Sequence, residues 1–130
     1  MKRSKIIIAV LAVLSLASMY TVAQDQSVPT KKEVTSLLKT ANEPPQHRRI
    51  AAYYRAEGAK LRQTAKEHSE LAAIYQHRQP FAAMESKHGD AFGQGTSHCK
   101  KFAELATEQA NEADALAKLH EEMAVAAERK

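Results

Sequence analysis

The chain of 130 residues is poor in the residues that interrupt or cross-link a fold, with one cysteine, four glycines and four prolines. A lone cysteine, Cys99, excludes an internal disulfide, so it is free, joined to another chain or a metal ligand. The stretches 47–75 and 98–127 contain no proline and a single glycine, Gly58. No segment alternates apolar and polar residues as a half-buried strand does. These absences favour an all-α protein built on long, uninterrupted helices.

The sequence also lacks the motifs that identify a hydrolase or a tight metal site. It contains no HExxH motif, no CxxC motif and no methionine-rich repeat. Gly93-Gln94-Gly95 has no strand before it and the wrong spacing for a nucleotide-binding loop. We therefore interpret these glycines as part of a flexible connection over residues 79–96, and we predict that the protein is not an enzyme.

The one long apolar run stands at the N-terminus. Three basic residues, at positions 2, 3 and 5, precede an apolar run over residues 6–20, and small residues follow at 21–23. This order is typical of a secretory signal peptide and predicts export across the inner membrane to the bacterial periplasm, with residues 1–23 removed. An uncleaved membrane anchor is the alternative, although the run is shorter than the ~20 apolar residues that a spanning helix needs.

The signal segment carries most of the net charge. The whole chain is +4, with 19 Lys and Arg against 15 Asp and Glu, and three of the 19 basic residues lie before residue 6. The remaining chain is close to neutral, which removes the basis for a prediction of nucleic-acid binding. Its charge is divided, because the first long stretch is basic and the second acidic. That division favours pairing of the two helices with each other or with copies of themselves, unless they are two solvated faces of unequal charge.

Small residues recur every seven positions in both long stretches. A seven-residue period holds one face of a helix against a partner helix, and small side chains let two backbones approach closely. The sequence therefore predicts a long antiparallel helical hairpin, with helices at about 46–78 and 97–128 and a loop at 79–96. The small residues that form its predicted Ala-rich seam are Ala51, Gly58, Ala65 and Ala72 in the first helix and Ala103, Ala110, Ala117 and Ala124 in the second.

A short helix is predicted before the hairpin. Thr30-Lys31-Lys32-Glu33 has the pattern of a capping box, and apolar residues then recur at helical spacing up to Ala41, before Pro44-Pro45. We assign residues 24–43 to a polar segment and this helix, and 44–130 to the hairpin domain. Because two Ala-rich helices bury little apolar area, we predict assembly into a bundle, most simply a homodimer of four long helices with no membrane span.

Histidine, cysteine and methionine residues form the candidate site. His47 and His68 are 21 positions apart, as are Cys99 and His120, so each pair lies on one face of its helix. The antiparallel register that matches the alanines brings His47 near His120 and His68 near Cys99. Such side chains suit Cu or Zn, unless they merely fill polar gaps in the bundle. The candidate metal ligands are His47, His120 and Met123 at one end and His68, His98 and Cys99 at the other.

Cys99 has a second interpretation. A helix that begins at 97 places Cys99 in its first turn beside His98, where the helix dipole and the imidazole would lower the pKa of the thiol. A reactive thiol of a redox protein, or a disulfide between two chains, then becomes possible. No general base and orienting group can be recognised around Cys99 in the sequence.

One resemblance adds to these patterns. The succession His47-Arg-Arg-Ile-Ala-Ala-Tyr-Tyr, His68-x-x-Leu-Ala-x-x-Tyr75, His98-Cys99 and His120-x-x-Met123-Ala resembles short, signal-bearing bacterial proteins of unassigned function. The resemblance covers about residues 47–126 and implies a secreted helical protein without an activity. From the residues themselves we predict an exported, non-enzymatic binding or assembly protein of the bacterial envelope. A periplasmic protein that binds Cu or Zn and a thiol redox protein that uses Cys99 are the alternatives.

Overall fold

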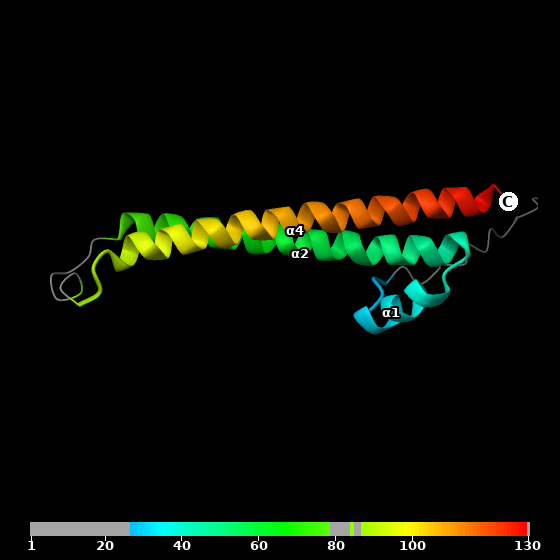
Figure 1. Cartoon of the computed structure of the whole chain (residues 1–130), viewed down its shortest axis with the longest axis horizontal. Helices are drawn as coiled ribbons and strands as arrows, with labels where there is room; N and C mark the ends of the chain where they lie inside the picture. The colour runs from blue at the N-terminus through cyan, green and yellow to red at the C-terminus, as the bar shows by residue number, and fades with distance from the viewer. Residues whose placement is uncertain (1–26, 79–83, 85–86, 130) are drawn as a thin grey trace, which may run out of the picture.

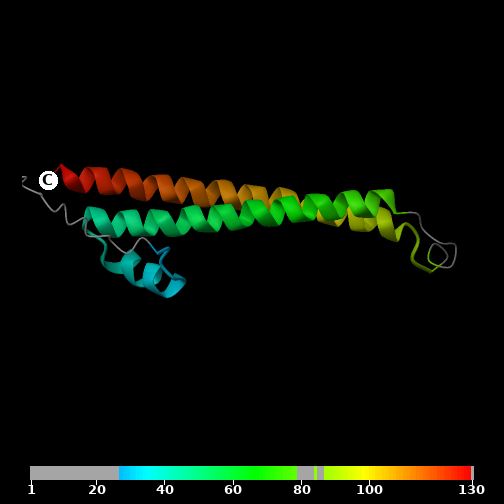
Figure 2. The same ribbon diagram turned by 180° about the vertical axis from the view of Figure 1, so that it is seen from behind.

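The computed structural model describes residues 27–78, 84 and 87–129. Its helices are α1 over Lys31–Thr40, α2 over Pro44–His77 and α4 over Ala91–Glu128. α2 and α4 run antiparallel and side by side, while α1 lies beside the first half of α2 (Figure 1), and the view from behind shows the same arrangement (Figure 2). The predicted all-α helical hairpin is confirmed, and these described ranges contain no strand. None of their helices is both long and apolar enough to cross a membrane. The predicted signal peptide lies outside them.

α2 begins two residues before the predicted start at 46 and continues without interruption to the predicted loop. Its first two residues are Pro44 and Pro45, whose missing N–H groups have no helical partner to lose in a first turn. The side chain of Gln46 accepts hydrogen bonds from the N–H groups of Asn42 and Glu43, at 2.9 and 3.1 Å. At ~1.5 Å per residue, α2 is about 51 Å long and α4 about 57 Å.

α4 begins at Ala91, six residues before the predicted start at 97, so the flexible loop predicted over Gly93-Gln94-Gly95 is wrong. Asp90 caps the helix, because its carboxylate accepts a hydrogen bond from the N–H of Gly93 at 2.9 Å. Gly95 faces α2, where a Cβ atom would lie 2.6 Å from the ring of Tyr75. Glycine at position 95 permits close contact between the helices, although its low helix propensity favours a break at this point of the sequence.

The predicted seam is confirmed, since all eight of its small residues are buried. Ala106 and Ala113 are buried as well, so α4 presents buried residues at alternating spacings of three and four from Ala103 to Ala124. At Gly58 a Cβ atom would lie 3.3 Å from the backbone oxygen of Ala110, which confirms the predicted close crossing. Ile50 is the one large side chain that is fully buried among the described residues. The hairpin is therefore held by close approach of two small-residue faces.

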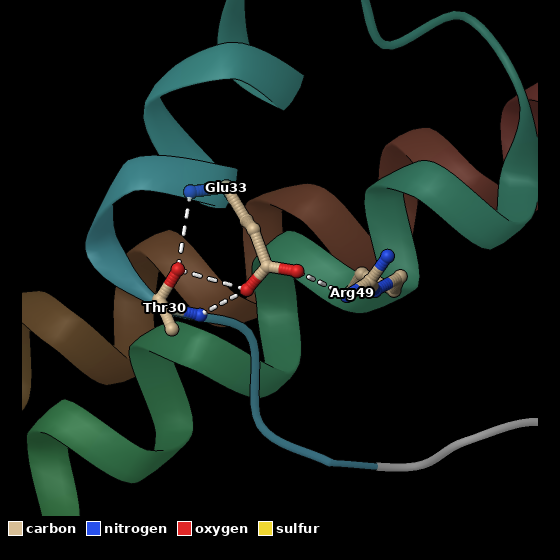
Figure 3. Close-up of polar contacts among 3 residues, drawn as sticks. All are labelled: Thr30, Glu33 and Arg49. Carbon is tan, nitrogen blue, oxygen red and sulfur yellow. Dashed lines mark hydrogen bonds and ion pairs between the residues drawn. The ribbon is translucent and has the colours of Figure 1, made fainter.

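α1 is fixed at its start by the predicted capping box, which is confirmed (Figure 3). The hydroxyl of Thr30 accepts a hydrogen bond from the N–H of Glu33 at 3.3 Å, and the Glu33 carboxylate accepts one from the N–H of Thr30 at 2.7 Å. The bond from the Thr30 backbone is the main reason that the pKa of Glu33 is lowered. Arg49 of α2 donates to the same carboxylate at 3.3 Å, which ties α1 to the hairpin.

Candidate functional site

One flank of the seam carries a ladder of ion pairs. Three arginines spaced by seven residues on α2 pair with three carboxylates spaced by seven on α4, and each of these side chains is about half exposed. The division of charge predicts such pairing, and the seven-residue spacing shared by the two helices sets the positions of the rungs. Exposed pairs stabilise little individually, so the ladder mainly selects the antiparallel register. We call the pairs Arg48–Glu128, Arg55–Glu121 and Arg62–Asp114 the ion-pair ladder.

The rung at Arg62 is bidentate. Its two terminal nitrogens donate to the two carboxylate oxygens of Asp114 at 2.7 and 3.2 Å. The hydrogen bonds from Arg62 hold the pKa of Asp114 below its usual value. This rung faces Gly58, since a Cβ atom at Gly58 would lie 2.8 Å from a carboxylate oxygen of Asp114. Glycine at this position therefore makes room both for the neighbouring backbone and for the ion pair.

The opposite flank of the seam is apolar. Phe102, Leu116 and Met123 each stand one residue before a buried alanine of α4, whereas the ladder carboxylates of Asp114 and Glu121 each stand one residue after a buried residue of α4. At 100° per residue, these two positions lie on opposite sides of the seam. Eight large apolar side chains here are between 38% and 63% exposed. We call them the apolar flank, which consists of Leu71, Ile74 and Tyr75 of α2 and Phe102, Leu105, Leu116, Leu119 and Met123 of α4.

The middle of the apolar flank is polar and slightly hollowed. Gln109 and Glu112 separate Leu105 from Leu116 along α4, and neither polar side chain has a hydrogen bond or ion pair with another described residue. An open groove passes over this point between the two long helices. Its walls are Tyr53, Tyr54 and Glu57 of α2 and Leu105, Glu108, Gln109, Glu112, Ala113 and Leu116 of α4.

His47 and His120 meet at the end of the seam, as the predicted register requires. Their Nδ1 atoms are 3.2 Å apart, while the centroids of the two rings are 5.4 Å apart. The rings therefore meet nitrogen to nitrogen, with one Nδ1–H donating to the other Nδ1. His120 is buried and takes a seam position that alanine fills elsewhere on α4. The ring of Tyr54 lies beside it at a centroid distance of 6.2 Å.

Burial lowers the pKa of His120, and the neighbouring His47 lowers it further when that ring carries a charge. The hydrogen bond between the two rings needs one Nδ1 without a proton. If both rings are protonated, each Nδ1 is a donor, the bond is lost and two positive charges meet in the seam. The pair can therefore hold one shared proton, or bind a metal ion through the lone pairs of its nitrogens.

The second predicted group is arranged differently. His68 packs on Phe102 of the apolar flank at a centroid distance of 4.4 Å, and its Nδ1 is buried without a hydrogen-bond partner among the described residues. Cys99 is free and half-buried. Because α4 begins at Ala91, the predicted position of Cys99 in a first helical turn is wrong, and the reason given for its reactivity does not apply.

Of the two predicted groups of metal ligands, the first brings two of its members into direct contact, His47 and His120. His98 is exposed and Met123 belongs to the apolar flank. In the part of the chain that the structure describes, no three His, Cys, Asp or Glu residues are placed to hold one metal ion. Of the candidates, only His47 and His120 are joined by a hydrogen bond. A metal at this end of the hairpin would take these two imidazoles as ligands.

Comparison with known protein families, with curated proteins and with solved structures finds no match to this chain. The resemblance to secreted bacterial proteins therefore stays a prediction, and the function has to be inferred from the two flanks of the seam and the histidine pair.

Proposed function

We propose that the chain is an exported, non-enzymatic binding or assembly protein of the bacterial envelope that acts through the apolar flank of its hairpin. The apolar flank carries this proposal, because eight large apolar side chains line one side of an extended rod and stay substantially exposed. The other side is already occupied by the ion-pair ladder. The pattern of basic, apolar and small residues over 1–23 supports export.

A helical partner fits this flank best. The apolar side chains of α4 form two groups, 102–105 and 116–123, and within each group they are three or four residues apart, which is the spacing that one helix presents to another. The hairpin alone fully buries only one large side chain among the described residues, so it gains stability when the flank is covered. The simplest partner is a second copy of the hairpin, which gives the four-helix bundle expected from the sequence.

Site-specific photo-crosslinking in bacterial cells tests this function. A photoreactive amino acid replaces Leu116 on the apolar flank, or Asn111, which follows Ala110 and so lies on the ladder side. We expect one discrete cross-linked species from position 116 and none from position 111, in a periplasmic product whose N-terminus is Gln24. Equal cross-linking from both positions, or none from position 116, contradicts the proposal. The mass of the product shows whether the partner is a second copy or another protein.

A second function, binding of Zn(II) or Cu(I), is favoured by the histidine pair. Two nitrogens on a tetrahedral zinc lie about 3.3 Å apart when each Zn–N bond is about 2.0–2.1 Å, close to the 3.2 Å between the Nδ1 atoms of His47 and His120. Both rings must turn, because their nitrogens now point at each other. Water or a residue of a second chain completes such a site.

Isothermal titration of the mature protein with Zn(II), and with Cu(I) under anaerobic conditions, tests metal binding. We expect one bound ion per chain, with a loss of affinity of roughly tenfold or more in His47→Ala and His120→Ala. His88→Ala, a change of an exposed histidine, should bind as the wild type does. If the two seam variants retain wild-type affinity, the histidine pair is a hydrogen bond inside the fold and the metal function is excluded.

A further inference from the structure

α4 carries a second complete stripe beside the seam. Starting at Phe102, its members follow one another at spacings of three, four, three, four and three residues. This is the alternation of a coiled-coil contact line, so α4 is built to face two helices at once, one through the seam and one through the stripe. The six central positions of the stripe are Phe102, Leu105, Gln109, Glu112, Leu116 and Leu119. Met123 continues the spacing four residues beyond Leu119, and its counterpart at the other end is His98.

The six central positions of the stripe have the same order of apolar and polar residues in both directions along the helix. Two apolar residues, two polar residues and two apolar residues follow each other, and the spacing is symmetric about the midpoint between Gln109 and Glu112. A stripe of this kind is complementary to itself when a second copy is turned end over end. A two-fold axis through the midpoint makes the contact isologous, with the same surface used by both chains.

We propose that α4 pairs with α4 of a second copy in an antiparallel dimer centred between Gln109 and Glu112. This inference rests on the proposed binding function and names its partner. Phe102 then lies opposite Leu119 of the second chain, and Leu105 opposite Leu116. At the centre, the amide of each Gln109 donates to the carboxylate of Glu112 in the other chain.

The polar centre selects this register over the parallel one. In a parallel pair each Glu112 faces the Glu112 of the other chain, and like charges at a contact oppose binding. In the antiparallel pair each Glu112 faces a neutral amide. The two polar side chains have no hydrogen bond or ion pair with another described residue in the single chain, so they are available for this contact. A buried polar pair of this kind fixes register in coiled coils.

The arrangement keeps the two cysteines apart. In the antiparallel pair Cys99 of one chain lies opposite position 122 of the other. The two Cys99 residues are therefore 23 residues apart, which is about 35 Å along the helix axis at ~1.5 Å per residue. The dimer is therefore non-covalent, in place of the disulfide between two chains that the single cysteine allowed. The loop end of α2 adds further apolar surface through Leu71 and Ile74, which are 43% and 63% exposed.

Sedimentation of the purified mature protein tests the pairing. The wild type is expected to be a dimer whose dissociation constant depends on position 109. Gln109→Glu faces Glu112 of the other chain and should weaken the dimer by roughly tenfold or more. Gln109→Lys creates an ion pair across the axis and should tighten it. Asn111→Glu, which adds the same charge on the ladder side, is the matched control and should leave the constant unchanged.

A distance measurement fixes the register. A spin label at Glu122→Cys, in a Cys99→Ser background, is expected to report about 35 Å between the two chains, whereas a parallel dimer brings the labels close together. A chain that is monomeric at all concentrations, a short label distance, or no response to the changes at position 109 overturns the pairing. If the monomeric chain still cross-links to another protein from position 116, the binding function stands and only the self-pairing fails.

Discussion

Ala110→Leu lowers the melting temperature of the mature protein by roughly 10 °C or more. Ala110 is fully buried in the seam. The helices are so close here that a Cβ atom added at Gly58 would lie 3.3 Å from the backbone oxygen of Ala110. A leucine there forces the two helices apart along their whole contact, because the neighbouring seam positions are also small. Overpacking of a close contact costs about 1–3 kcal/mol or more, and about 1 kcal/mol shifts the melting temperature of a domain of this size by roughly 4–8 °C.

Ala115→Leu is the matched control. Ala115 lies on the same helix but is exposed, so the same added volume meets water and should change the melting temperature little. Both variants are melted by circular dichroism at one protein concentration, because association alters the apparent stability. If both variants melt with the wild type, or if Ala115→Leu is the more damaging, α2 and α4 do not meet through Ala110.

Acidification from pH 8 to pH 5.5 lowers the free energy of unfolding through the histidine pair. The pKa of His120 is lowered in the folded protein, so below its ordinary value of 6.5 the unfolded chain binds the proton more readily than the folded chain. The stability that neutral His120 contributes is therefore complete above about pH 6.5 and is lost as the pH falls through its lowered pKa. The carboxylates with lowered pKa, Glu33 and Asp114, start from 4.5 and 3.8 and titrate below this window.

His120→Ala separates this effect from the rest of the chain. The change continues the alanine pattern of the seam, so the variant should fold at pH 8 and lose most of the difference between pH 8 and pH 5.5. His98→Ala removes an exposed histidine from the same helix and should keep the wild-type dependence. Urea unfolding at the two pH values measures both. A dependence that survives in His120→Ala assigns it to another group and contradicts the shared proton.

The seam could be predicted from the sequence because it depends on volume alone. Small residues at every seventh position leave a packing helix little choice of face, and the register that aligns Gly58 with Ala110 also brings His47 to His120. The start of α4 could not be predicted in the same way. Glycines at 93 and 95 have low helix propensity, and the contact with Tyr75 that makes Gly95 necessary joins residues 20 positions apart.

The candidate site was only partly accessible to sequence reasoning. His68 and Cys99 each lie 21 residues from a member of the His47–His120 pair, so the sequence predicts that they also meet. In the structure the ring of His68 packs on Phe102, a larger side chain than Cys99. The ion-pair ladder and the apolar flank were both present as seven-residue patterns next to the seam. They become meaningful only when the antiparallel pairing places the three arginines of α2 against the three carboxylates of α4 on one flank and leaves the exposed apolar side chains on the other.

Disulfide trapping across the closest crossing tests the central claim, that two small-residue faces meet in an antiparallel hairpin. Gly58→Cys and Ala110→Cys are combined in a Cys99→Ser background and oxidised under mild conditions. We expect one disulfide within each chain, because a Cβ atom at position 58 lies 3.3 Å from the backbone oxygen of Ala110, and little trapping when Ala103→Cys, one seven-residue repeat away, replaces Ala110→Cys. Equal trapping in both variants, or disulfides formed only between chains, contradicts the hairpin.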